Sequence, residues 1–125
     1  MIHNDTIVAP ATPSGGAIAI VRVEGENAIA ITDGFVRLPQ GRKLSEMKGY
    51  TMAHGEVWDN TRRVDDVVIS LFRTPNSYTG GDMVEIACHG SAFIVSEIVR
   101  LAIDGGARAA TAGEFTKRAF LAGKI

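Results

Sequence analysis

The sequence predicts an α+β fold, in which helices pack on one side of a mixed β-sheet. Two apolar runs, 50–58 and 64–72, flank a short polar segment and indicate a hairpin with a loop at 59–63. Other strand-like runs are separated by segments of helical spacing, and such a separation favours crossover connections. Apolar residues make up 46% of the 125 residues and charged residues 22%, which is typical of one globular domain.

The N-terminal half is expected to contain two strands, a helix and the hairpin. Residues 6–9 form a short strand, and 10–16 form a loop because they hold two prolines and two glycines. Residues 17–23 are apolar on both faces until Arg22, as in a central strand. Helical spacing of Ala28, Ile31 and Phe35 predicts a helix over 27–36. The polar segment 39–49 is predicted to be a surface connection.

The C-terminal half is expected to add two strands and two helices. Residues 73–81 are predicted to form a loop, and 83–89 alternate as a strand does. Ser91 is placed to cap a helix that runs to about Asp104 and stops at Gly105. A short strand at 107–110 and a last helix at 114–122 complete the fold. Because this last helix ends abruptly, we expect the chain to be a fragment of a longer protein.

Charge, cysteine content and missing motifs exclude several functions. The net charge is −1, but residues 1–107 carry −4 and residues 108–125 carry +3, too few for a nucleic-acid footprint. The single cysteine, Cys88, excludes an internal disulfide, and the three histidines lack metal-ligand spacing, so no metal site is expected. No phosphate-binding glycine loop occurs. Without a secretory signal or a membrane-length apolar run, the sequence indicates a cytoplasmic protein that does not contact membranes.

The strand 83–89 carries the most informative side chains. Its alternation places Glu85 and His89 on one face, and Val84, Ile86 and Cys88 on the other, which we expect to be core. The face of Glu85 is either a ligand-binding concavity or a solvated outer surface. Cys88 and His89 point to opposite faces, so a catalytic cysteine is not expected; no other residue is predicted to be catalytic.

Arg22 and the last helix offer further candidates. A buried charge late in an apolar strand needs a ligand or a partner. The alternatives for Arg22 are that it only marks the solvent-exposed end of the strand, or that it pairs with Glu24 or Asp82. In the last helix, Glu114 and Arg118 form an i,i+4 pair. Phe115 and Phe120 are expected to join the core, and Lys117, Arg118 and Lys124 to form a solvated basic face.

Three blocks of sequence stand out along the chain. They are Asp5-Thr6-Ile7-Val8-Ala9 with Ala11-Thr12-Pro13 and Ala17–Val23, then Asn76–Gly80 with Asp82, Val84-Glu85-Ile86 and His89-Gly90, and finally Gly113–Thr116 with Arg118–Leu121 and Gly123-Lys124. These blocks resemble, in the same order, those of the MnmE (TrmE) family of bacterial tRNA-modification GTPases. The chain departs from the family at Gly81, where a glutamate is usual, and at Ser91, where a second glycine is usual.

The resemblance implies that residues 1–125 are the family's N-terminal domain, with its helical and GTPase domains absent. That domain is similar to the tetrahydrofolate-binding fold of aminomethyltransferases. It forms homodimers and binds 5-formyltetrahydrofolate or 5,10-methylenetetrahydrofolate, the one-carbon donor for C5 modification of the wobble uridine of tRNA. The family's binding positions fall on Arg22, Glu85 and Lys124.

The resemblance also implies partners for the full-length protein. It is expected to hydrolyse GTP, with Mg²⁺ and K⁺, in its GTPase domain, and to act with an MnmG-like flavin protein on tRNA. Two alternatives remain open from the sequence. One is a dimerisation or scaffold module that has lost folate binding, and the other is a stand-alone aminomethyl transferase.

Overall fold

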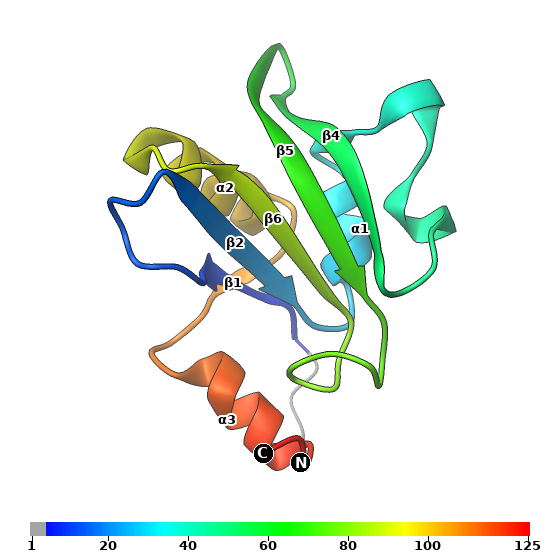
Figure 1. Ribbon diagram of the computed structural model, residues 1–125, viewed down its shortest axis with the longest axis vertical. Helices are drawn as coiled ribbons and strands as arrows, with labels where there is room; N and C mark the ends of the chain where they lie inside the picture. The colour runs from blue at the N-terminus through cyan, green and yellow to red at the C-terminus, as the bar shows by residue number, and fades with distance from the viewer. Residues whose placement is uncertain (1–4) are drawn as a thin grey trace.

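A computed structural model describes residues 5–125 and contains a mixed sheet ordered β3-β4-β5-β6-β2-β1-β7 (Figure 1). The β1–β7 pair is parallel, and all other neighbouring strands are antiparallel. The α+β class is therefore confirmed. The elements are β1 (Ile7–Pro10), β2 (Ile18–Glu24), α1 (Ala28–Asp33), β3 (Val36–Arg37), β4 (Thr51–Asp59), β5 (Arg62–Phe72), β6 (Met83–His89), α2 (Ala92–Asp104), β7 (Arg108–Ala109) and α3 (Glu114–Leu121).

The helices do not all lie on one side of the sheet, so that part of the prediction is wrong. Helices α1 and α2 cover one face, whereas α3 lies at the lower end of the sheet (Figure 1). The α3 side chains Phe115 and Arg118 contact Arg22 and Glu24 of β2, which alternate with the core residues of that strand. We call the face that carries Arg22 the outer face.

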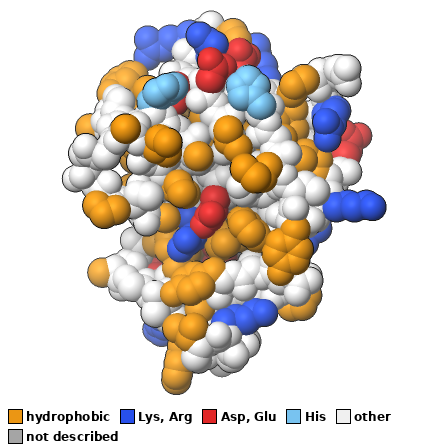
Figure 2. Space-filling model, viewed as in Figure 1, with side chains coloured by type: hydrophobic (Ala, Val, Ile, Leu, Met, Phe, Trp, Pro, Cys, Tyr) orange, Lys and Arg blue, Asp and Glu red, His pale blue; other side chains and the backbone are white. Residues whose placement is uncertain are grey.

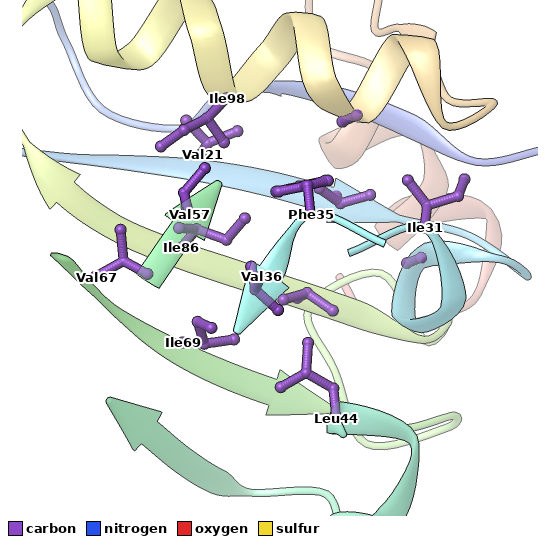
Figure 3. Close-up of a cluster of buried hydrophobic side chains, with 14 of the residues drawn as sticks. Val21, Ile31, Phe35, Val36, Leu44, Val57, Val67, Ile69, Ile86 and Ile98 are labelled. Atoms are coloured by element: carbon purple, nitrogen blue, oxygen red, sulfur yellow. The ribbon is translucent and has the colours of Figure 1, made fainter. Parts of the chain in front are cut away.

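The core lies between the sheet and helices α1 and α2 (Figure 3). Alternate residues of the central strands point into it, among them Val21 and Ile86, both 0% exposed. On α2, Ile98 and Ala102 are one turn apart, and both are fully buried. The predicted core face of β6, namely Val84, Ile86 and Cys88, is confirmed.

The segment 27–49 differs from the prediction. Helix α1 ends at Asp33, and β3 then pairs with β4. The polar connection contains two short 3₁₀ turns, Pro39–Gly41 and Leu44–Glu46. Leu44 is fully buried, and its backbone N–H donates to the Asp33 carboxylate at 2.7 Å. Met47 is also buried, so two apolar side chains, Leu44 and Met47, attach this otherwise polar connection to the core.

The hairpin is longer than predicted. Strand β4 runs to Asp59 and β5 begins at Arg62, so the loop is only two residues rather than the predicted 59–63. Asn60 adopts a positive φ of 40° in this turn, which asparagine tolerates better than most residues. Within residues 5–125, no helix combines the length and the apolar character that crossing a bilayer would require.

Candidate functional site

Arg22 and Glu85 form an ion pair on the outer face of the sheet. They stand directly opposite each other on the antiparallel strands β2 and β6. Both Nε and Nη2 of Arg22 donate to Oε2 of Glu85, at 2.9 and 2.8 Å, and about a fifth of each side chain is exposed (20% and 21%). Among the described residues, no group donates to Oε1 of Glu85. The pair therefore presents one carboxylate oxygen as an acceptor for a ligand.

Two aromatic rings flank the guanidinium of Arg22. Its Cζ lies 5.4 Å from the ring centroid of Tyr78 and 5.1 Å from that of Phe115. The hydroxyl groups of Tyr78 and Thr116 are hydrogen-bonded at 3.0 Å, which joins the loop before β6 to α3. A cavity of about 490 Å³ opens beside these groups and is lined by Arg22, Tyr78 and Phe115 together with residues 9–11 and 110–114. Glu85 does not line this cavity, because Arg22 lies between them.

Arg118 anchors α3 to the sheet. Its Nη1 donates to Oε1 of Glu24 at 2.7 Å, and its Nη2 donates to the carboxylate of Asp5 at 2.6 Å. Only 10% of the Arg118 side chain and 5% of the Glu24 side chain are exposed. The prediction of a solvated Arg118 is therefore wrong, although the predicted contact with Glu114 is present at 3.5 Å.

Glu24 also fills the space beside Gly81. A Cβ atom built on Gly81 would lie 2.5 Å from Oε2 of Glu24, which accepts a hydrogen bond from the Thr79 hydroxyl at 2.9 Å. A second cavity, of about 570 Å³, lies between this loop and α3, with Arg118 in its lining. The carboxylate of Glu24, which extends from β2, therefore occupies the space that a side chain at position 81 would need.

Lys124 follows the end of α3. Gly123 adopts a φ of 75°, and the N–H groups of Gly123 and Lys124 bond to the carbonyls of Phe120 and Ala119 at 3.0 and 2.9 Å. These two bonds define a Schellman motif, which fixes the backbone of Lys124. Its Cε lies 3.6 Å from the position that a Cβ of Gly80 would take. No hydrogen bond or ion pair among the described residues joins Lys124 to Arg22 or Glu85.

Comparisons with known proteins fit this arrangement. A family model described as "GTP-binding protein TrmE N-terminus" matches residues 6–124. The chain belongs to this family. A protein named tRNA modification GTPase MnmE from Flavobacterium johnsoniae is 47% identical over 126 residues, which cover 100% of this chain and 27% of that protein. The MnmE of Bacteroides fragilis is 47% identical over 99% of the chain, and that of Christiangramia forsetii is 49% identical over 98%.

This TrmE N-terminal domain spans about a quarter of the length of those relatives, 27% in Bacteroides fragilis and 26% in Christiangramia forsetii. The resemblance seen in the three sequence blocks is thereby confirmed. Of the three residues predicted to bind a ligand, the structure brings Arg22 and Glu85 into contact. It places Lys124 beside Gly80, in the loop that leads to β6.

Other predictions for the TrmE N-terminal domain are corrected or confirmed residue by residue. Arg22 pairs with neither Glu24 nor Asp82, because the β2–β6 register places Glu85 opposite it. Phe120 is 66% exposed and does not join the core. Cys88 is buried, and burial raises the pKa of its thiol to about 11, which fits a core residue rather than a nucleophile.

Sequence reasoning missed one polar contact of the TrmE N-terminal domain. Nδ1 of His89 lies 2.8 Å from Oδ1 of Asp65, and the backbone N–H of His89 donates to Oδ2 of the same carboxylate at 2.9 Å. Asp65 is the second residue of the predicted strand 64–72, and nothing in the sequence marks it as the partner of a residue 24 positions away. Within residues 5–125, no group of three or more His, Cys, Asp or Glu side chains could hold a metal ion.

Proposed function

We propose that this chain is the part of a tRNA-modification GTPase that binds 5-formyl- or 5,10-methylene-tetrahydrofolate and joins two copies of the protein. In that role it supports C5 modification of the wobble uridine, position 34, of tRNA. The membership of the TrmE N-terminal family supports the first part of the proposal. The observation that carries folate binding is the Arg22–Glu85 pair, which leaves one oxygen of a partly buried carboxylate available on the outer face.

The chemistry of this pair suits a pterin. A pterin offers an exocyclic amine and a ring N–H side by side, and a carboxylate accepts from such donors. Arg22 neutralises Glu85 and offers cationic N–H groups to a carbonyl or formyl oxygen. The rings of Tyr78 and Phe115 keep this area partly apolar, and we assign Lys124 to the same ligand. The folate itself supplies the one-carbon unit, whereas the residues of this chain bind and orient it.

Calorimetric titration of the chain with 5-formyltetrahydrofolate tests the proposal. Glu85→Gln keeps the side-chain size but places a donor amide where the pterin needs acceptors. We expect a loss on the order of 2–4 kcal/mol, or about 30- to 1,000-fold in affinity. Glu56→Gln is the matched control, because Glu56 also lies on the outer face and pairs with Arg63 at 3.4 Å. Unchanged affinity in a folded Glu85→Gln variant would contradict the assignment.

The outer face itself favours self-association. Exposed apolar side chains lie on β4 and β5, among them Met52, which is 68% exposed, and Val68, which is 38% exposed. Figure 2 shows hydrophobic side chains gathered over these strands. A second copy of the chain would cover them through a two-fold interface, the commonest closed arrangement. Sedimentation at tens of micromolar should show a dimer that Met52→Lys weakens, and an unshifted monomer fraction in that variant would argue against this face.

The same face supports a second candidate, a dimerisation module that no longer binds folate. Arg22 and Glu85 satisfy each other without a ligand, and Gly81 lacks the family's usual carboxylate. Dimerisation without any heat of folate binding would favour this candidate. It would leave the scaffold role as the function of the chain.

The rest of the proposal concerns the full-length protein. We assign GTP hydrolysis, with Mg²⁺ and K⁺, to regions outside this chain, and the action on tRNA to a complex with an MnmG-like flavin protein in the cytoplasm. The chain has no glycine-rich phosphate loop in its sequence. Micromolar GTP binding by this chain alone would contradict that division of labour.

A further inference from the structure

Asp65 holds the imidazole of His89 in one orientation. The Asp65 side chain is only 8% exposed, whereas the His89 side chain is 73% exposed. Both carboxylate oxygens of Asp65 bond to His89, one to its backbone N–H at 2.9 Å and one to its Nδ1 at 2.8 Å. Because Nδ1 bonds to Asp65, Nε2 is the ring nitrogen left for another molecule, and no hydrogen bond or ion pair joins it to a described residue. A buried carboxylate thus orients an exposed imidazole.

The backbone around His89 is equally well fixed. The N–H of Gly90 donates to the Ala17 carbonyl at 2.8 Å, and a Cβ on Gly90 would lie 1.7 Å from the Gly16 carbonyl oxygen. The end of β6 is therefore pressed against the segment that leads into β2. The bond from Asp65 to the backbone N–H of His89 satisfies that donor. The second bond, to the ring, serves the position of the side chain.

His89 lies at one end of a strip that begins at the Arg22–Glu85 pair. The β2–β6 register places Arg22 opposite Glu85, then Ile20 opposite Ala87, and then Ile18 opposite His89. His89 lies four residue steps along the strand from Glu85, which corresponds to about 13 Å. The strip therefore presents an acceptor at one end, apolar side chains in the middle and an imidazole at the other end. Ile18, in this strip, is 68% exposed.

We infer that His89 binds the carboxylate tail of a ligand whose head binds at Glu85. The inference rests on the folate binding proposed above and names a further binding residue for it. A reduced folate carries a donor-rich pterin, a flat apolar aminobenzoyl ring and an anionic glutamate, in the same order as the strip. In its imidazolium form, His89 donates from Nε2 to the glutamate carboxylate while Nδ1 donates to Asp65. The aminobenzoyl ring covers Ile20 and Ile18.

The strip also separates His89 from Lys124. Lys124 packs beside Gly80, in the loop before β6, and so lies beyond the Glu85 end of the strip. A ligand whose head is bound at Glu85 can direct its tail toward only one of the two cations. The apolar path along Ile20 and Ala87 leads to His89, which leaves Lys124 to the head of the ligand.

The test compares two ligands that differ only in the tail. The complete 125-residue chain is titrated with 5-formyltetrahydrofolate and with 5-formyltetrahydropteroyl methylamide, in which a neutral amide replaces the glutamate. The parent chain should prefer the glutamate ligand by roughly tenfold. His89→Ala should lose this preference and bind the methylamide as the parent does. Asp65→Asn should lose part of it, and His89→Gln, which keeps a donor, should retain part of it. His54→Ala is the matched control, because His54 is an exposed histidine of β4. This variant should keep the parent's preference for the glutamate ligand over the methylamide.

Each remaining outcome overturns the inference in a recognisable way. If His89→Ala lowers the affinity for both ligands equally, His89 affects binding only by supporting the fold and does not contact the tail. An unchanged preference in that variant would remove His89 from the site, and its loss in Lys124→Ala instead would reverse the direction of the ligand. If the parent binds neither ligand, the proposed folate function fails, and this inference fails with it.

Discussion

We expect that a carboxylate at position 81, in the loop before β6, can replace the carboxylate of Glu24 on β2 as the partner of Arg118. Glu24 reaches from the strand into the space beside Gly81, where it bonds to Arg118 at 2.7 Å and to Thr79 at 2.9 Å. A Cβ at position 81 would lie 2.5 Å from Oε2 of Glu24. The sequence resemblance implies a glutamate at position 81 in other members of the family. We therefore expect that Glu24 replaces the loop carboxylate in this chain and that the two positions are energetically coupled.

The expected free energies follow from burial and crowding. The Glu24 side chain is only 5% exposed, and Glu24→Ala deprives Arg118 of this partner but leaves it Asp5. We therefore expect the free energy of unfolding to fall by about 2–3 kcal/mol. Gly81→Glu adds a side chain to a filled space and brings two carboxylates close together, so the free energy of unfolding should fall by about 1–3 kcal/mol. In the double variant the new carboxylate enters the vacated space beside Arg118. The combined loss should then be smaller than the sum by at least about 1 kcal/mol.

Urea unfolding, followed by circular dichroism, measures all four free energies of the cycle. A control cycle combines Gly81→Glu with Glu97→Ala on α2, where Glu97 pairs with Arg100 and has no contact with the loop. The control should be additive within about 0.5 kcal/mol. If the Glu24 cycle is additive to the same degree, the two positions are independent and the reasoning fails.

Three further predictions concern single residues. The Ser91 hydroxyl caps α2 by accepting from the N–H of Ile94 at 3.3 Å, so Ser91→Ala should cost about 1 kcal/mol in urea unfolding and Ser91→Gly only a few tenths; equal losses would exclude a capping role. Because burial raises the pKa of Cys88 to about 11, the native chain at pH 8 should react with a thiol reagent only as fast as it opens, and rapid modification without urea would contradict the burial. The hydrogen bond from Arg108 lowers the pKa of Glu114 from 4.5 to about 2, so this carboxylate stabilises the fold above pH 4.5 and loses that effect as the pH falls toward 2. Glu114→Gln should therefore reduce the acid dependence of stability between these values, and an identical pH profile would refute it.

Local patterns predicted most of the strands and helices. The alternation of 83–89 placed Glu85 on one face and Cys88 on the other, and the structure confirms both. Ser91 and Gly105 marked the two ends of α2 because capping depends on residues close in sequence. The burial of Leu44 differs from the predicted surface connection, and the partner of its backbone N–H, Asp33, lies eleven residues away in the sequence.

Strand order and register could not be read from local patterns. The alternation of β2 and β6 fixes which side chains share a face, but it does not say that Arg22 stands opposite Glu85. Arg118 was misjudged for a similar reason, because its partners Glu24 and Asp5 lie 94 and 113 residues away. Likewise the contact of Asp65 with His89 arises only when β5 and β6 are neighbours. The missing information is in each case a long-range pairing.

The way α3 is attached has a consequence for the motions of the chain. No backbone-to-backbone hydrogen bond joins α3 to the sheet within residues 5–125. The helix is held by side chains, chiefly Arg118, Phe115 and Glu114, the last of which pairs with Arg108 of β7 at 2.7 Å. Detachment of α3 therefore leaves the sheet ladder and the main core intact, and it constitutes a local opening of lower free energy than global unfolding. The amide hydrogens of α3 should exchange with solvent deuterium well before those of β2 and β6. Because Phe115 stacks on Arg22, a ligand bound at the Arg22–Glu85 pair should also change the exchange rate of the helix.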